Sequence, residues 1–351
     1  MKPYYTINHI TYTPSELLSQ CEKALLSHLP EWELAVWAFV KEWLTAEDAI
    51  ELKTSGSTGT PKTIKVEKKY LRNSALMTLE FLHLQAGDTA LLCLSANYIA
   101  GKMMIVRALE GGLNLLLHEA VGNPLKGCSD KITFAAMVPL QVEKVLAEEG
   151  TARLQAIDHL IIGGAAVSAT LQESLRPLSN EIWSTYGMTE TVSHIAMRPL
   201  SGAAATEDFV PMPGVKLTTD ERGCLQIEAS HLCAEPVVTN DLVALDIRGH
   251  FRFLGRYDNV INSGGIKLMP EVIEQKIASL IEDRFFISSL ADEHLGQKLV
   301  LYIETTAPEK YEWTALQEKM ADILPKYERP KVLICLPKLE ETQSGKVKRH
   351  F

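Results

Sequence analysis

The chain has 351 residues, a formal net charge of −9, and hydrophobic residues at 46% of its positions. This length exceeds what one hydrophobic core usually fills, so two domains are expected. The glycine and proline content excludes fibrous and disordered classes, and the acidic balance argues against a general nucleic-acid binder. No apolar run is long enough to span a membrane, no secretory signal opens the sequence, and six scattered cysteines favour a reduced, cytoplasmic protein.

The first two thirds of the chain show helical and strand-like patterns in alternation. The first 50 residues look helical overall. Helices are predicted from Ser15, as the capping residue, through Leu26, over residues 32–44, and over Lys68–His83. Strand-like runs lie at residues 89–95, 113–118, 131–138 and 159–164. Strands that alternate with helices predict a large α/β domain with parallel-rich sheets.

The pattern changes near residues 255–265. A helix is predicted from Pro270, strands over 285–290 and 298–304, a helix through 316–324, and a strand over 331–336. These elements predict a small C-terminal α+β domain with a core of its own. We therefore expect an N-terminal domain at 1–255 and a C-terminal domain at 256–351, with the boundary near Asp258.

The segment between residues 54 and 62 concentrates glycines, hydroxyls and one lysine. It reads Thr54, Ser55, Gly56, Ser57, Thr58, Gly59, Thr60, Pro61 and Lys62. Glycines allow close approach of the backbone, whose N–H groups can converge on phosphate oxygens. A flexible surface turn has a similar composition, so the segment alone leaves both interpretations open.

In its order of residues, this segment resembles the phosphate loop of the adenylate-forming enzymes, which include acyl-CoA synthetases and peptide-synthetase adenylation domains. Further motifs, in the family's order, support the resemblance. It implies a large α/β domain with a mobile C-terminal lid, and ATP, Mg²⁺ and CoA as cofactors. It also assigns ATP phosphate binding to residues 54–59 and Lys62.

Residues 184–191, STYGMTET, are similar to the family's second motif. The resemblance implies that Tyr186 stacks on the adenine and that Gly187 faces the nucleotide. It also implies that Thr189 is catalytic, with a hydroxyl for phosphate, and that Glu190 is both catalytic and the Mg²⁺ ligand. Upstream, Gly163, Gly164 and Ala165 resemble the segment whose backbone lines the adenine pocket. The alternatives are a strand end with a solvent-facing Glu190 and an ordinary strand-to-helix turn.

Two further motifs lie between residues 239 and 259. Residues 239–241 resemble the family's TGD motif, with Asn240 in place of glycine, and imply that Asp241 holds the ribose hydroxyls. Arg256, in GRYDN, is implied to reach ribose or phosphate with its fixed set of donors. Asp258 is implied to be the hinge between the domains. A surface aspartate in a turn is the alternative for Asp241.

The remaining family motifs lie in the predicted lid. Gly264, Gly265 and Lys267 resemble a loop that faces the active site during thioester formation. Lys346, in SGKVKR, is similar to the family's C-terminal lysine, which stabilises charge on the α-phosphate. A solvated basic tail is the alternative for this segment.

Substrate-pocket segments most resemble the o-succinylbenzoate–CoA ligases of menaquinone synthesis. In that branch the stretch that matches residues 97–101 usually carries a histidine, whereas this chain has Asn97 and Tyr98. Arg107 and Lys102 are the candidates for binding the succinyl carboxylate, or else are helix-surface cations. Tyr98, Ser193 and His194 are the further candidates for lining the acid pocket.

The resemblance implies a ligase that forms an acyl-adenylate and transfers the acyl group to a thiol, with small-molecule partners and no nucleic acid. The alternatives are another aryl- or acyl-CoA ligase, an adenylation domain that loads a carrier protein, and a non-catalytic nucleotide-binding protein. The phosphate loop begins at residue 54, earlier than is common in the family. This spacing implies a shortened N-terminal region. We expect either a partner subunit in a homo-oligomer or a more open acid pocket to compensate for the missing part of the large domain.

Overall fold

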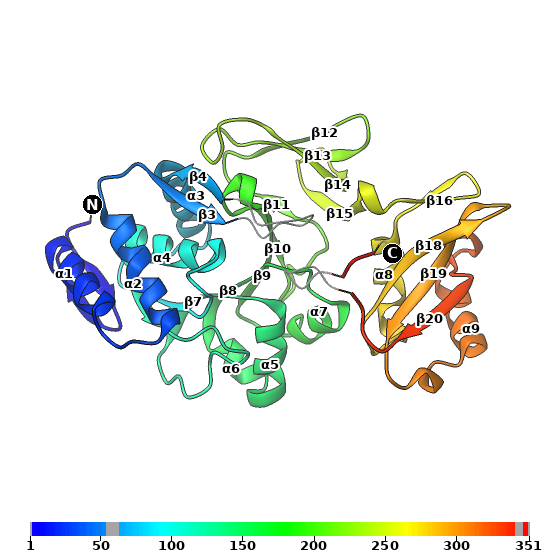
Figure 1. Ribbon diagram of the computed structural model, residues 1–351, viewed down its shortest axis with the longest axis horizontal. Helices are drawn as coiled ribbons and strands as arrows, with labels where there is room; N and C mark the ends of the chain where they lie inside the picture. The colour runs from blue at the N-terminus through cyan, green and yellow to red at the C-terminus, as the bar shows by residue number, and fades with distance from the viewer. Residues whose placement is uncertain (1, 54–62, 341–346, 350–351) are drawn as a thin grey trace. The chain divides into compact units, whose positions relative to one another are not determined.

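The computed structural model describes residues 2–53, 63–340 and 347–349 (Figure 1). The described residues fall into two compact units. The first contains residues 2–53, 63–216 and 227–237, and the second contains 217–226 and the described residues from 238 onward. The domain division at 255/256 and the hinge near Asp258 fall inside the second unit and stay predictions about which segment moves.

A mixed sheet forms the centre of the first unit. Its strand order is β11-β10-β9-β8-β7-β5-β6-β1-β2. The strands are β1 (Tyr5–Ile7), β2 (Ile10–Tyr12), β5 (Thr89–Leu92), β6 (Asn114–Leu117), β7 (Ile132–Met137), β8 (Ile157–Ile162), β9 (Glu181–Gly187), β10 (His194–Pro199) and β11 (Val210–Pro211). From β1 to β9 along this order the neighbours are parallel, and only the outer pairs are antiparallel. The prediction of an α/β domain with a parallel-rich sheet is confirmed.

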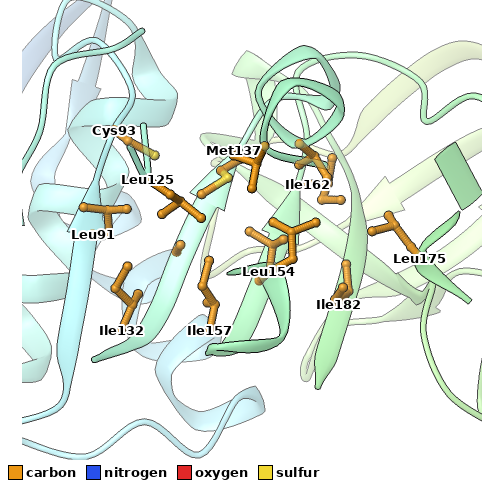
Figure 2. Close-up of a cluster of buried hydrophobic side chains, with 14 of the residues drawn as sticks. Leu91, Cys93, Leu125, Ile132, Met137, Leu154, Ile157, Ile162, Leu175 and Ile182 are labelled. Carbon is orange, nitrogen blue, oxygen red and sulfur yellow. The ribbon is translucent and has the colours of Figure 1, made fainter. Parts of the chain in front are cut away.

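Helices pack against this sheet. They are α1 (Pro14–Leu25), α2 (Glu31–Leu44), α3 (Lys68–Phe81), α4 (Ile99–Gly111), α5 (Pro139–Glu149), α6 (Thr151–Gln155) and α7 (Ala169–Leu175). Figure 2 shows the apolar cluster in which α6 (Leu154) and α7 (Leu175) meet Ile157 and Ile162 of β8. The parallel strands of the central sheet are buried on both faces, which explains their continuous apolar sequence.

The N-terminal region differs from its prediction in two ways. Thr13, not Ser15, caps α1, because its side chain accepts from the backbone of Glu16 while the Glu16 carboxylate accepts from the backbone of Thr13. Residues before α1 form β1 and β2 rather than helix. Asn8 and His9, in the turn between β1 and β2, take positive φ angles. Strands as short as these leave little signal in the sequence from which to predict them.

A buried lysine joins α2 to α3. The Lys68 ammonium donates to the carbonyl oxygens of Glu42 (2.7 Å), Trp43 (3.1 Å) and Thr45 (3.1 Å) at the end of α2. The Glu42 carbonyl also accepts from the Thr45 backbone and hydroxyl, and a cation is favoured at a helix C-terminus, where the last carbonyls lack intrahelical donors. Burial lowers the pKa of Lys68.

Two strands flank the predicted phosphate loop. β3 (Ala49–Lys53) and β4 (Thr63–Glu67) pair antiparallel, with Ala49 opposite Glu67 and Lys53 opposite Thr63. Residues 54–62, which carry the predicted phosphate contacts, lie outside the described residues. The strands nevertheless show that residues 53 and 63 stand opposite each other at the end of a hairpin.

A separate four-stranded sheet has the order β12-β13-β14-β15. Its strands are β12 (Lys216–Thr219), β13 (Cys224–Glu228), β14 (Val237–Leu245) and β15 (Phe251–Arg256). The sequence prediction did not include them.

The C-terminal α+β part of the second unit has its own core. It contains β16 (Ile261–Ser263), β17 (Ile266–Leu268), α8 (Pro270–Ile277), β18 (Phe285–Asp292), β19 (Gly296–Glu304), α9 (Trp313–Ile323) and β20 (Val332–Leu336). Ile273 and Ile277 of α8 and Leu316 and Met320 of α9 are buried together with Leu301 of β19. The predicted α+β arrangement of this region is confirmed. None of the helices in the described part of the chain combines the length and apolarity needed to cross a membrane.

Replacing Lys68 with methionine tests the α2–α3 connection. Lys68→Met keeps the apolar stem but removes the ammonium that donates to the Trp43 and Thr45 carbonyls, so the free energy of unfolding should fall by about 1–3 kcal/mol. Urea unfolding measures the change. Lys69→Met is the matched control, because Lys69 is exposed and its contacts among the described residues are with Glu67 and Tyr70 at the surface. Equal stability of the two variants would contradict the connection.

Candidate active site

Two glycine-containing segments meet at one edge of the central sheet. Gly163 and Gly164 follow β8, and Tyr186 and Gly187 end β9, the parallel neighbour of β8. A Cβ on Gly163 would lie 2.4 Å from the Thr185 hydroxyl, so only glycine fits there. The carboxyl edge of a parallel sheet is where α/β proteins bind ligands. The predicted adenine-pocket segments are thus adjacent, with Ala165 exposed beside them.

The Tyr186 ring is supported by residues that the sequence analysis missed. Phe209 meets it edge-on, with the ring centroids 5.9 Å apart, and the Arg198 guanidinium lies 5.5 Å from the Phe209 centroid. Arg198 in turn pairs with Glu207. Aromatic edges and cations over ring faces are favourable arrangements. These residues lie 12 to 23 positions after Tyr186, with no motif to mark them.

A tight turn follows β9 and carries the predicted phosphate and magnesium residues. Thr189 and Glu190 belong to a single 3₁₀ turn, Thr189–Thr191. The Thr191 hydroxyl donates to a carbonyl and Val192 adopts φ 67°, an uncommon angle for a β-branched residue. Glu190 is exposed. One exposed carboxylate fits Mg²⁺, which is typically bound by one or two carboxylates together with phosphates and water.

The turn ends at a group of contacting side chains, Arg107, Thr78, Ser193 and His194, which we call the cationic cluster. Arg107, on α4, is 2% exposed; its Nη2 donates to the Ser193 hydroxyl (3.0 Å) and its Nε to the Thr78 hydroxyl (3.3 Å). His194 Nε2 lies 3.1 Å from the same Thr78 oxygen. The structure therefore brings three of the predicted acid-pocket residues together, and it adds Thr78 from α3, which the sequence analysis did not identify.

Arg107 is a buried charge whose described partners are all neutral. Its remaining contact is a weak one with the Met104 sulfur, and no described aspartate or glutamate forms an ion pair with it. Burial lowers the pKa of Arg107 to about 9, which still leaves it charged at neutral pH. Burial and then the charge of Arg107 hold the pKa of His194 well below its usual value, so the imidazole is neutral.

The other two acid-pocket candidates lie elsewhere on α4 and just before it. Tyr98 precedes the helix and is exposed. Lys102 Nζ contacts the Glu51 carbonyl oxygen at 3.4 Å and lies 4.8 Å from the Phe39 ring centroid. Of the two cations considered for the succinyl carboxylate, Arg107 is thus the one in the buried cluster. The role of Tyr98 stays a prediction.

In the second unit, the predicted ribose and hinge residues form one network. Asp241 is buried and accepts from Arg256 Nη1 at 3.0 Å, and Arg256 Nη2 donates to Asp258 at 3.2 Å. The pairing of β14 with β15 sets Asp241 directly opposite Arg256. The two motifs, 15 residues apart in sequence, therefore share a strand pair.

Asn240, which replaces the usual glycine, takes part in this network. Its amide oxygen accepts from Arg222 (2.9 Å) and its amide nitrogen donates to Asp258 (3.2 Å). Asn240 is not among the described residues with a positive φ, so its backbone does not require glycine. The substitution leaves the Asp241 carboxylate in place.

The lid motifs are described in part. Gly264 and Gly265 form the turn between β16 and β17, with φ angles of 59° and 81°, and Lys267 is exposed on β17. Lys346 lies outside the described residues. The Arg349 side chain that follows it pairs with the half-buried Glu274, and the Arg349 carbonyl accepts from Ser288 at 2.7 Å.

Comparisons with known proteins identify the family of this chain. The model of the AMP-binding enzyme family matches residues 14–226. A solved acyl-CoA synthetase (AMP-forming)/AMP-acid ligase II-like protein from Dyadobacter fermentans is 37% identical, with a TM-score of 0.64. The match covers 94% of this chain and 96% of that one.

Two ligases whose names give the same activity are also similar to this chain. The 2-succinylbenzoate–CoA ligase of Escherichia coli is 26% identical over 310 residues, which cover 84% of this chain and 66% of the relative. The chain thus matches about two thirds of that relative's length. An o-succinylbenzoate CoA synthetase from Bacillus subtilis, solved with its acyl-adenylate intermediate, is 18% identical with a TM-score of 0.79, covering 99% and 94% of the two chains. At that identity the likeness shows the shared fold.

Gly187 provides a test of the turn between β9 and β10. A Cβ there would lie 2.3 Å from the Ser193 carbonyl oxygen and 2.5 Å from His194 Cα, and both are backbone atoms. Gly187→Ala should therefore displace the turn, lower the free energy of unfolding by about 1–3 kcal/mol and reduce ATP–pyrophosphate exchange at least about tenfold.

Gly127→Ala is the matched control for this variant. Gly127 has φ 72° and nothing within 4 Å of a built Cβ, so only backbone strain opposes the change. Its stability should fall by about 1 kcal/mol while exchange is unchanged. Unaltered exchange in Gly187→Ala would show that the turn does not need this close approach.

Proposed function

Because the chain belongs to the AMP-binding enzyme family, we propose that it is an ATP-dependent acid–thiol ligase that activates o-succinylbenzoate for transfer to CoA, in menaquinone biosynthesis. The observation that carries the choice of acid is the buried guanidinium of Arg107, which has no carboxylate partner among the described residues. A substrate with a second carboxylate would supply that partner through a charge-assisted, two-point contact.

The reaction proceeds by two displacements. In the first, one carboxylate of the acid attacks the α-phosphate of ATP, a phosphorus–oxygen bond forms, and pyrophosphate leaves. In the second, the thiolate of CoA attacks the acyl carbon, a thioester forms, and AMP leaves. Both depend on positioning and on stabilisation of developing charge more than on a protein nucleophile.

The residues divide these tasks among themselves. Tyr186 and the 163–165 segment hold the adenine, Asp241 and Arg256 hold the ribose, and the Thr189 hydroxyl binds phosphate. Residues 54–62 and Lys346 supply the remaining phosphate contacts. A magnesium ion, bound through Glu190, would neutralise charge on the phosphates.

The second displacement is assigned to the small C-terminal region. Rotation near Asp258 would withdraw Lys346 and bring in the loop of Gly264, Gly265 and Lys267. The Asn240–Asp258 hydrogen bond is consistent with a pivot beside the ribose motif. All six cysteines are free thiols, which favours a reducing compartment such as the cytoplasm.

An exchange assay across carboxylic acids tests the proposal. Radiolabelled pyrophosphate should enter ATP with o-succinylbenzoate, and CoA should then be consumed in equal amount. Benzoate, which lacks the second carboxylate, should support exchange much more weakly. Exchange without CoA consumption would indicate loading of a carrier protein, and exchange with another acid alone would replace the proposed substrate.

Arg107 is the residue to vary. Arg107→Met keeps the length and the apolar packing of the stem but removes the charge, so KM for o-succinylbenzoate should rise about 100-fold while KM for ATP stays within about twofold. Arg107→Lys should show a smaller rise, because the charge remains but the planar pair of donors is lost. An unchanged KM for the acid in Arg107→Met would exclude Arg107 as its receptor.

A further inference from the structure

The Thr78 hydroxyl lies at the centre of the cationic cluster. It donates its only proton to the Ser74 carbonyl oxygen, one turn earlier in α3, at 3.0 Å. Its oxygen accepts from Arg107 Nε, which has no acceptor capacity of its own, and lies 3.1 Å from His194 Nε2. A hydroxyl oxygen has two lone pairs, and here both are used.

The neighbouring ring contacts the same oxygen. With the Thr78 proton on the Ser74 carbonyl, the Nε2–H tautomer of His194 donates to Thr78. The imidazole is neutral, so the cluster holds a single positive charge, on Arg107. A neutral donor in this place satisfies Thr78 without adding a second cation that would repel Arg107.

The same contact determines which part of Arg107 is available to a ligand. The guanidinium can offer a carboxylate two donors either from its two terminal nitrogens or from one terminal nitrogen and Nε. Thr78 occupies Nε. The terminal nitrogens have only the Ser193 hydroxyl and the Met104 sulfur, a weak acceptor 3.7 Å away.

We propose that Thr78 is a positioning residue for acid recognition, which holds the guanidinium of Arg107 by Nε so that its terminal nitrogens face the second carboxylate of the substrate. This inference rests on the proposed function, because it requires Arg107 to receive that carboxylate. Thr78 suits the role, because it is fully buried, branched at Cβ and held by its bond to Ser74. The acid specificity of the enzyme thus depends on a side chain that does not touch the acid.

Thr78→Val is the direct test, because valine has nearly the same shape but no acceptor. KM for o-succinylbenzoate should rise about tenfold, the range expected when a hydrogen bond to a charged group is lost. KM for ATP should stay within about twofold. Preference for o-succinylbenzoate over its analogue with an amide in place of the distal carboxylate should fall by a similar factor. Thr78→Ser restores the hydroxyl and should restore both values.

Matched variants separate positioning from general damage. Thr133→Val makes the same change in β7, where the hydroxyl accepts a 3.4 Å contact from the Thr89 backbone, and should leave both KM values unchanged. If Thr78→Val does not fold, Thr78→Ala takes its place, with the same expected rise in KM. Equal rises in KM for the acid and for ATP would indicate a structural role only and would overturn the inference.

The outcomes distinguish this inference from the proposed function. If Arg107→Met raises KM for the acid but Thr78→Val does not, Arg107 is the receptor and the role of Thr78 is wrong. If Arg107→Met leaves KM for the acid unchanged, both the receptor and its positioning residue are excluded. Parallel rises in the two variants, with rescue by Thr78→Ser, would support both.

Discussion

A buried positive charge that has no carboxylate partner among the described residues is the constraint on which the acid pocket depends. Removing a guanidinium from water is costly, and neutral acceptors offset only part of that cost. The described residues around Arg107 provide two hydroxyls and a sulfur, and burial lowers its pKa. Such an arrangement is unfavourable for the isolated protein and favourable for binding an anion, since the desolvation has already occurred before the ligand arrives.

The position of this charge relative to the nucleotide motif follows from one short turn. β9 ends at Gly187, the chain reverses through Thr189–Thr191 and the left-handed Val192, and β10 begins at His194. The close approach of Gly187 to the backbone of residues 193 and 194 leaves no room for a side chain at residue 187. The predicted magnesium residue and the Arg107 partner Ser193 are therefore held a few residues apart on a constrained segment.

The sequence predicted most about the strands that are buried along their whole length. The strands of the parallel sheet are buried on both faces, and their apolar runs predicted β5 to β8 and the α/β class. It predicted least where local geometry determines the structure. β1 and β2 have only three residues each, and Thr13 instead of Ser15 caps α1. Arg107, Ser193 and His194 could be proposed as acid-pocket residues from the family resemblance, but Thr78 could not. It is one hydroxyl in an amphipathic helix, and only the packing of α3 against α4 shows its contacts.

Asn240 shows why a departure from a motif need not imply a lost site. A glycine is required only where the backbone is left-handed or where a Cβ would collide, and neither condition is found at Asn240. Its amide instead connects Arg222 with Asp258, while Asp241 keeps its strand-pair contact with Arg256. The carboxylate assigned to ribose is thus set by the pairing of β14 with β15, which the residue before it does not alter. What Asn240 changes is the set of contacts at the proposed hinge.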